Sequence, residues 1–314
     1  MREIKTVALI GLGAIGGFVA PRLQKQLGDR FCVIAGGSRK ERLEKQGVII
    51  NDVNYKFHIV EPEAKNGYVD FAIFATKNTQ LDQAIADMKN QIGPDTIVMS
   101  LLNGVTSEVR IGDVYGSDNI LTTIIRLPSL NQGGKITYPE ERGKISFGEE
   151  KNETLSENVK AVKDLFDAAG IGYEIPKDML KTMWMKYMTN VSENQTCAIL
   201  GTPYKGFHKS EHIEHIRESA AREVIAIAQK KQIDLTEEDL IAHRTYLQNL
   251  IPHGKPSTLQ DIEAGRKTEV ETFAGDVIRM GKEVGVATPY NEIFYHMICA
   301  LEEKNEGKFA IEKK

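Results

Sequence analysis

Hydrophobic residues in the first half of the chain gather in short runs, and the stretches between these runs have helical spacing. The run Thr96–Leu102 is almost wholly apolar, whereas Asn78–Asn90 places its apolar residues on one side of a helix. Continuous apolar runs of this length are typical of strands that are buried on both faces of a parallel sheet. We therefore predict strands, with helices between them, over five ranges: Thr6–Ile10, Phe31–Ala35, Asp70–Thr76, Thr96–Leu102 and Asn119–Leu127.

Two further pairs of β-like segments interrupt this alternation, and we predict that each pair forms a hairpin. The first pair is Val48–Asn51 with Lys56–Val60. The second pair is Lys135–Tyr138 with Lys144–Gly148.

From residue 177 the spacing of hydrophobic residues becomes helical and stays so through residue 304. Strands that alternate with helices predict a parallel sheet covered on both faces, whereas helical spacing alone predicts a separate all-α domain. A chain of 314 residues also exceeds the size at which one hydrophobic core usually stops growing. We therefore predict an α/β protein with an N-terminal Rossmann-type doubly wound sheet (residues 1–175) and an all-α C-terminal domain (residues 176–314).

A glycine-rich loop, within TVALIGLGAIGG, follows the first predicted strand and precedes a helix. In a Rossmann unit the first glycine of GxGxxG makes a tight turn, the second lets the backbone approach a pyrophosphate, and the third lets the helix pack on its strand. The N-terminus of the helix then favours the bound anion. A glycine turn without a ligand is the less favoured interpretation. The predicted dinucleotide-binding residues are Gly11, Leu12, Gly13, Ala14, Ile15 and Gly16.

The residues after the second predicted strand indicate which nicotinamide cofactor is used. A site that prefers NAD usually places Asp or Glu at the end of this strand, where it accepts from the ribose 2′-hydroxyl. This chain has glycine there, followed by Ser38, Arg39 and Lys40. A hydroxyl and two cations suit a 2′-phosphate, so we predict NADP(H) with Arg39 as a contact. The alternative is that Arg39 and Lys40 only begin a solvated helix face.

A row of polar side chains crosses an otherwise apolar helix in KTMWMKYMTNVSENQTCAIL. Lys186, Asn190 and Asn194 recur at steps of four, which places them along one stripe. Partial removal from water makes a lysine a plausible general acid, and two amides beside it can orient a polar small molecule. A helix rim whose amides bond to nearby backbone is the alternative. We expect a separate, more solvated sector for Thr189, Ser192, Glu193 and Thr196.

Two other stretches support a site. In LLNGV, Asn103 lies just past an apolar strand, at the edge where open α/β sheets bind ligands. The stretch KPSTLQDIEAGRKTEVETFAG opens with Ser257 and Thr258, which could cap a helix, and continues with many charges. A cap and a solvated charged face are the alternative interpretation of this second stretch.

Composition and charge narrow the class of protein. A net charge of −4 offers no general attraction to nucleic acid, and the apolar runs are far too short to span a bilayer. The N-terminus enters a strand pattern at once, which leaves no room for a signal peptide. Cys32, Cys197 and Cys299 fit neither a disulfide framework nor a metal motif. We predict a soluble cytoplasmic protein that binds neither nucleic acid nor membrane, and a homodimer is one possible assembly.

Three histidines in HKSEHIEH, at positions 208, 212 and 215, have a spacing that could gather a metal on one helix face. No carboxylate or cysteine motif completes the set, and its neighbours look solvated. We therefore predict no metal site and favour a pH-responsive surface face.

Four motifs together resemble the ketopantoate reductase (2-dehydropantoate 2-reductase) family. They are GLGAIGG, the xNG end of a strand, W-x-K-x-x-x-N-x-x-x-N and PSxxQDxxxGRxTE, in this order across nearly the whole chain. The resemblance implies reduction of 2-dehydropantoate, a 2-oxo acid, to (R)-pantoate with NADPH, on the route to pantothenate and coenzyme A.

The resemblance also implies roles for individual residues. Lys186 resembles the general acid that protonates the ketone oxygen while a hydride arrives from nicotinamide. The other implied roles are these: Asn190 and Asn194 orient the substrate, Ser257 binds the substrate carboxylate or its neighbourhood, Asn103 lies at the junction of cofactor and substrate, Lys77 reaches the cofactor, and Glu269 lies near the cofactor ribose and the substrate hydroxyl.

Departures from the family pattern leave the substrate open. Thr202-Pro203-Tyr204 stands where the family often has another asparagine, and PSTL replaces a PSSM-like stretch. Two other functions therefore remain: a related 2-oxoacid or opine-type dehydrogenase, and a non-catalytic NADP-sensing protein. The row at Lys186 argues against the sensor, which has no need of an acid beside two amides.

Overall fold

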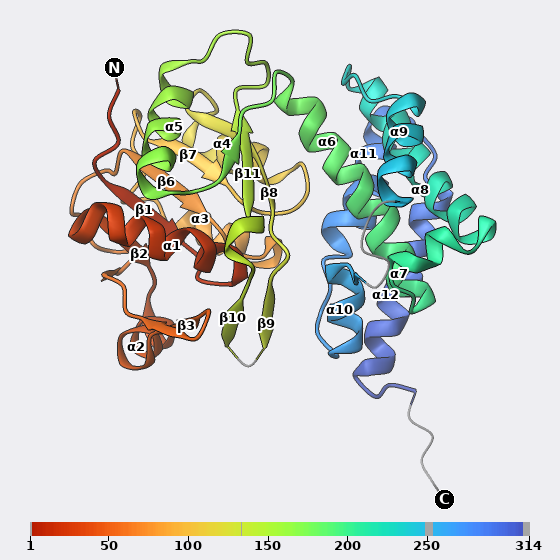
Figure 1. Cartoon of the computed structure of the whole chain (residues 1–314), viewed down its shortest axis with the longest axis horizontal. Helices are drawn as coiled ribbons and strands as arrows, with labels where there is room; N and C mark the ends of the chain where they lie inside the picture. The colour runs from red at the N-terminus through yellow and green to blue at the C-terminus, as the bar shows by residue number, and fades with distance from the viewer. Residues whose placement is uncertain (1, 133, 249–253, 310–314) are drawn as a thin grey trace, which may run out of the picture. The chain divides into compact units, whose positions relative to one another are not determined.

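The structure is a computed structural model that describes residues 2–132, 134–248 and 254–309 (Figure 1). The chain forms two compact units, Met1–Met183 and Trp184–Lys314. The first unit is an α/β sheet structure and the second is helical, which confirms the predicted fold class. The units divide inside helix α6 (Met179–Thr189), whereas the sequence places the domain boundary just before this helix. The domain limits 1–175 and 176–314 remain a prediction.

The first unit is built on an eight-stranded sheet with the order β12-β11-β8-β7-β6-β1-β2-β5. Neighbouring strands are parallel from β5 to β8, and β11 runs antiparallel to β8. All five long strands predicted from the sequence are present. The strands are β1 (Val7–Ile10), β2 (Phe31–Ile34), β5 (Ile59–Val60), β6 (Phe71–Phe74), β7 (Ile97–Ser100), β8 (Ile120–Arg126), β11 (Lys144–Gly148) and β12 (Tyr173–Glu174).

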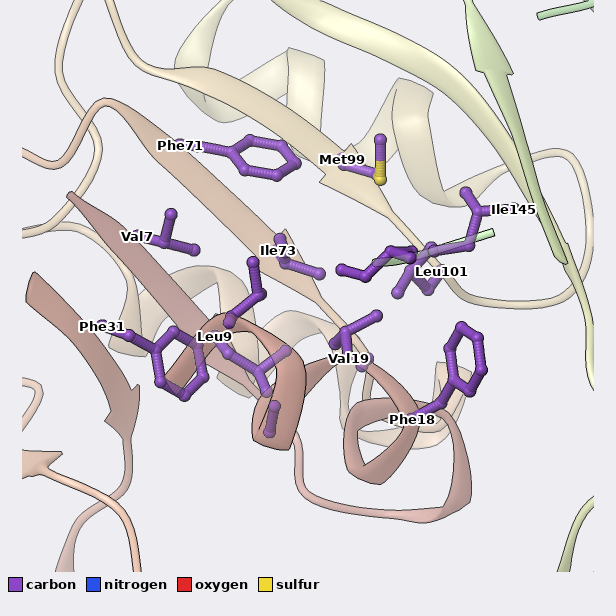
Figure 2. Packing of buried hydrophobic residues seen from close by; sticks show 14 of the residues in the cluster. Val7, Leu9, Phe18, Val19, Phe31, Phe71, Ile73, Met99, Leu101 and Ile145 are labelled. Atoms are coloured by element: carbon purple, nitrogen blue, oxygen red, sulfur yellow. The ribbon is translucent and has the colours of Figure 1, made fainter. Parts of the chain in front are cut away.

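Helices cover both faces of this sheet, which explains why its central strands β1, β2, β6 and β7 are almost wholly apolar. In β1, Val7 and Leu9 belong to one core cluster with Phe18 and Val19 of α1, as Figure 2 shows. Ala8 and Ile10 of the same strand belong to a second cluster, which packs on α3 and α4. Because successive side chains of a strand point to opposite faces, both sets must be apolar. The helices are α1 (Ala14–Leu27), α2 (Gly37–Gln46), α3 (Leu81–Asp87), α4 (Ser107–Tyr115) and α5 (Glu157–Ala169).

A second, four-stranded sheet has the order β4-β3-β10-β9. Strands β3 and β4 form a hairpin, so the first strand of the predicted pair is present but its predicted partner is wrong. Ile59–Val60, within that predicted partner, pairs with β2 of the main sheet. The strands are β3 (Val48–Ile50), β4 (Val53–Tyr55), β9 (Leu130–Gln132) and β10 (Lys135–Thr137).

The pairing predicted for the second hairpin is wrong. Strand β10 pairs with β9 and β3, whereas Lys144–Gly148 pairs with β8 and extends the main sheet. Ile145 and Phe147 are fully buried in the core of that sheet, so burial of apolar side chains decides the partner.

The second unit contains helices and no strand among its described residues. Two of its turns, Asn190–Asn194 and Glu271–Gly275, are π-helical. No helix in the described part of the chain is both long and apolar enough to cross a bilayer. Its α-helices are α6, which starts before the division, α7 (Gln195–Leu200), α8 (Glu211–Lys230), α9 (Glu237–Gln248), α10 (Ser257–Glu263), α11 (Asp276–Val284) and α12 (Pro289–Asn305). Short 3-10 turns elsewhere in the chain cover Gly28–Arg30, Asn78–Gln80, Glu140–Arg142 and Tyr204–His208.

Candidate active site

The glycine loop lies between β1 and α1, and two of its glycines are enforced by close packing. Gly11 has φ +101°, and a Cβ added there would lie 2.5 Å from the carbonyl carbon of Ala75. A Cβ on Gly16 would lie 1.9 Å from the carbonyl oxygen of Gly11. A Cβ on Gly13 would meet nothing within 4 Å. The first and third glycines thus hold the turn together, and the middle one borders open space through which a ligand can approach the backbone.

The start of α1 has the features of an anion site. Gly13 is the N-cap of this helix, and no side-chain hydrogen bond caps it. The first N–H groups of a helix have no partner within the helix and carry its positive dipole end. Leu12 is buried in the core, whereas Ala14 and Ile15 are half-buried. This cradle fits the pyrophosphate of a dinucleotide.

Helix α2 starts directly after β2 and carries Ser38, Arg39 and Lys40 in its first turn. Lys40 forms an ion pair with Glu61, with 3.1 Å between Nζ and Oε1. Arg39 is half-buried, and burial followed by the nearby charge of Arg42 lowers the pKa of its guanidinium. Of the two predicted cations, Arg39 is therefore the better placed to receive a phosphate, because Lys40 already has a carboxylate partner.

The loops after β6 and β7 lie at the same edge of the sheet as the glycine loop. Asn78 donates a hydrogen bond from Nδ2 to the carbonyl oxygen of Asn103, at 2.8 Å, which ties the two loops together. The N–H of Ala75 donates to the carbonyl oxygen of Ile10, which ties the β6 loop to the end of β1. Lys77 is exposed and Asn103 is half-buried. Three sheet ends that carry predicted site residues therefore meet at this edge.

Two residues of this edge were missed by the sequence analysis. The Oγ1 atom of Thr76 and the Oδ1 atom of Asn78 are buried and have no hydrogen-bond partner among the described residues. Buried polar atoms without partners are costly and rare, so a pair of them marks a place that a polar ligand can complete. Both flank Lys77 directly after a buried strand, and this position was the available signal.

In the second unit, Lys186 lies in the last turn of α6 and is half-buried. Asn190 begins the π-helical turn and is half-buried, and Asn194 ends this turn and is 7% exposed. The Nδ2 atom of Asn194 donates to Oγ of Ser257, 63 residues away in the sequence, at 3.5 Å. The structure thus brings two predicted substrate residues together, and Lys186 is on the same continuous helical segment.

The expectation of a Ser/Thr cap at the start of α10 is wrong. Ser257 is the first residue of the helix, the N-cap is Pro256, and no side chain caps it. The Ser257 side chain is therefore exposed and available to contact Asn194 rather than its own helix.

The predicted solvated sector of the row is also wrong, because Ser192, Glu193 and Thr196 are buried. The helices of this unit cover them, and His243 of α9 contacts the carboxylate of Glu193 at 2.6 Å. The Oγ of Ser192 donates to the carbonyl oxygen of Met188 at 2.8 Å. The sequence alone gives no sign of this cover, since all three residues are usually exposed.

Glu269 is half-buried and lies just before the second π-helical turn. Its carbonyl oxygen accepts from the N–H groups of Thr272 and Phe273. The hydroxyl of Tyr187, next to Lys186 on α6, donates to the carbonyl oxygen of Phe273 at 3.0 Å. Burial raises the pKa of Tyr187 far above its ordinary value, so this hydroxyl keeps its proton. Tyr187 therefore links the helix of Lys186 to the turn that follows Glu269.

Of the three histidines, His212 and His215 are exposed and His208 is half-buried, and a pH response of this face remains a prediction. The Nε2 atom of His208 lies 2.9 Å from the carbonyl oxygen of Leu247, so this imidazole is engaged by α9. Within the described ranges, no three His, Cys, Asp or Glu side chains form a group that could hold a metal ion.

Comparison with known proteins identifies the family. The family model described as ketopantoate reductase PanE/ApbA matches residues 7–152, and the model of its C-terminal part matches residues 178–302. Among curated relatives, an uncharacterized oxidoreductase of Bacillus subtilis is 24% identical over 91% of this chain and 95% of its own length. The 2-dehydropantoate 2-reductase of Streptococcus pyogenes is 24% identical over 94% of this chain and 97% of its own length.

A solved structure resembles the whole fold. The ternary structure of D-mandelate dehydrogenase with NADH and anilino(oxo)acetate has a TM-score of 0.83 and 25% sequence identity, and the match covers 96% of this chain and 99% of that chain. The chain therefore belongs to the ketopantoate reductase family and is an oxidoreductase.

Proposed function

We propose that this protein reduces 2-dehydropantoate to (R)-pantoate with NADPH, in the cytoplasm, on the route to pantothenate and coenzyme A. The observation that carries the proposal is the hydrogen bond between Asn194 and Ser257. It joins two of the residues that the family resemblance assigns to the substrate, and one of them shares a helical segment with Lys186. A dimer of this chain is also part of the proposal.

The cofactor is held by the first unit. The backbone of the glycine loop from Gly11 to Gly16 receives the pyrophosphate, and Arg39 receives the 2′-phosphate. Lys77 and Asn103 contact the cofactor from the loops after β6 and β7. When bound, the reduced nicotinamide supplies a hydride.

Lys186 supplies the proton that balances the reaction. As the carbonyl carbon of the 2-oxo acid gains a hydride, its oxygen gains negative charge, and a nearby ammonium stabilises that charge and then protonates it. The C=O double bond becomes a C–OH single bond. Asn190, Asn194 and Ser257 hold the substrate by hydrogen bonds to its polar groups, and Glu269 contacts the substrate hydroxyl.

One alternative substrate has support of its own. The neighbouring D-mandelate dehydrogenase was solved with NADH and anilino(oxo)acetate, which carries an aromatic ring. Reduction of an aromatic 2-oxo acid with NADH is therefore the second candidate function. This reaction would also use a general acid and polar groups that orient a carboxylate.

The test is a panel of 2-oxo acids assayed by the oxidation of NADPH and of NADH. We expect the highest kcat/KM for 2-dehydropantoate with NADPH. A higher kcat/KM for the 2-oxo acid that corresponds to mandelate would favour the second candidate. Tight NADPH binding without turnover of any panel member would favour a sensor and contradict the proposal.

A further inference from the structure

A cluster of buried charges lies beside the π-helical turn that carries Asn190 and Asn194. At its centre, Arg217 of α8 is 0% exposed and donates two hydrogen bonds to Glu214, at 3.1 and 2.6 Å. Glu193, from the π-helical turn, is 4% exposed and lies 3.9 Å from Nη1 of Arg217. The Nε2 of His243, on α9, donates to Oε1 of Glu193 at 2.6 Å.

Glu193 is not required to balance the other charges of this cluster. Glu214 and Glu218 share Arg217, and both also lie within 3.4 Å of Arg244 on α9. These four residues alone pair two carboxylates with two guanidinium groups between α8 and α9. Glu193 adds a third carboxylate that is itself only 4% exposed, and burial of a charge is expensive even when it is paired. Buried ion pairs contribute little to net stability, but in some proteins they fix a register.

The π-helical turn has a register that needs to be fixed. Its i→i+5 hydrogen bonds accommodate one extra residue compared with an α-helix. A slip to α-helical bonding would rotate the residues that follow by about 100°. Asn194, which follows Glu193 directly, would then leave Ser257. Side chains already satisfy carbonyl groups here, since Nε2 of Gln195 donates to the carbonyl oxygen of Val191 at 2.7 Å.

We propose that Glu193, held by His243 and Arg217, is a positioning residue that fixes the π-helical turn so that Asn190 and Asn194 face the substrate. This inference rests on the proposed function. The two sides of one turn are held by different elements: α8 and α9 hold Glu193, and α10 meets Asn194. The cluster thereby couples the substrate amides to the body of the second unit.

The test compares Glu193→Gln with two variants of its partner, His243→Ala and His243→Gln. Glu193→Gln keeps the size of the side chain and removes its charge. We expect a rise of about tenfold in KM for the 2-oxo acid, with the Kd for NADPH changed less than about twofold. His243→Ala should raise KM similarly. His243→Gln should keep KM close to the wild-type value, because its amide keeps a donor near the Nε2 position.

The matched control is Glu237→Gln. Glu237 pairs with Arg222 at 2.7 Å between the same two helices, but both side chains are 44% exposed. This variant should leave KM unchanged. A purely structural role of Glu193 would lower the melting temperature and the active fraction, which reduces kcat at constant KM. Native KM in both Glu193→Gln and His243→Ala overturns the inference.

A second measurement separates this inference from the proposed function. Hydrogen exchange of the backbone amides of residues 190–194 is read without substrate, with the amides of α12 as an internal reference. We expect faster exchange in Glu193→Gln only at the π-helical turn. If the wild-type protein reduces no 2-oxo acid, the proposed function fails, and unchanged exchange at residues 190–194 would then overturn the positioning role as well.

Discussion

Three side chains of one helical segment, Lys186, Asn190 and Asn194, carry the polar chemistry of the proposed reaction. In this proposal Lys186 supplies the proton, and the two amides orient the substrate. The segment keeps them half-buried or buried, so each is partly shielded from bulk water. Hydrogen bonds and charges act more strongly in such surroundings than in water.

Replacing Lys186 with Ala should remove the proton donor and leave the glycine loop intact. We expect kcat to fall by roughly 10²- to 10⁴-fold, the range for loss of a general acid, while the Kd for NADPH stays near the wild-type value. Steady-state kinetics and fluorescence titration of NADPH measure the two quantities. Lys181→Ala, on the same helix, is the control, and near-normal kcat in Lys186→Ala would show that another group is the acid.

Arg39 is the residue expected to distinguish the two nicotinamide cofactors. Arg39→Ala should raise the Kd for NADPH by roughly tenfold or more, because a charge-assisted contact to the 2′-phosphate is lost. The Kd for NADH should hardly change. The dissociation constants of both cofactors measure this. Lys40→Ala, which removes the partner of Glu61, is the control. Equal weakening of NADPH and NADH in Arg39→Ala would mean that Arg39 does not contact the phosphate.

At the scale of elements, the glycines of the turn between β1 and α1 have two different roles. Gly11 and Gly16 are fixed by the packing of their neighbours, whereas Gly13 borders open space. Packing and ligand access are therefore separate requirements, and single substitutions can test them separately.

Gly13→Ala should keep the fold but weaken the binding of NADPH. The added Cβ has room in the free protein, but it occupies the space through which the cofactor would approach the backbone. Gly11→Ala should instead destabilise the protein by roughly 2 kcal/mol or more, since both its positive φ and the contact at 2.5 Å oppose a side chain. Thermal unfolding and NADPH titration distinguish the two effects. Normal NADPH affinity in Gly13→Ala would contradict the predicted pyrophosphate site.

The elements that could be predicted from the sequence are those that a local pattern determines. Four of the five strands are almost wholly apolar and buried on both faces, so their pattern is unambiguous. The partner of Lys144–Gly148 depends instead on burial in a distant core, which the hairpin spacing does not reveal. The π-helical turn at Asn190–Asn194 also escaped prediction, because no local preference separates it from an α-helix.

The site followed the same division. The close packing of Gly11 and Gly16 could be expected from one short motif, because the backbone within that motif sets it. The buried oxygen atoms of Thr76 and Asn78 become visible only when the surrounding loops are folded. The burial of Glu193 likewise depends on α8 and α9, which are distant in the sequence.

At the scale of the whole molecule, the N-terminal segment is attached to the sheet by one carboxylate, Asp70. Its Oδ2 accepts from the N–H of Lys5 and from the N–H of Thr6, each at 2.8 Å, and from the hydroxyl of Thr6 at 3.0 Å. Burial opposes ionisation of Asp70, but these hydrogen bonds outweigh it and hold its pKa below the ordinary value of 3.8. Folding therefore favours the ionised form.

This linkage predicts how stability depends on pH. Because the pKa of Asp70 is lower in the folded state, its stabilising contribution is present above the ordinary value of 3.8 and is lost as the pH falls through the folded value. Asp70→Asn should lower the free energy of unfolding by about 1 kcal/mol at neutral pH, a modest figure because the group is partly solvated. Denaturant unfolding at several pH values measures this difference. A deficit in Asp70→Asn that stays constant into acid would contradict the linkage.

The central claim is that this chain transfers a hydride from NADPH to the carbonyl carbon of 2-dehydropantoate and protonates the oxygen. The most direct measurement uses NADPH that carries deuterium at the transferable position of the nicotinamide, with mass spectrometry of the product. We predict (R)-pantoate with one deuterium on its C2 carbon. Unlabelled product, or no pantoate from a protein that binds NADPH normally, would contradict the claim.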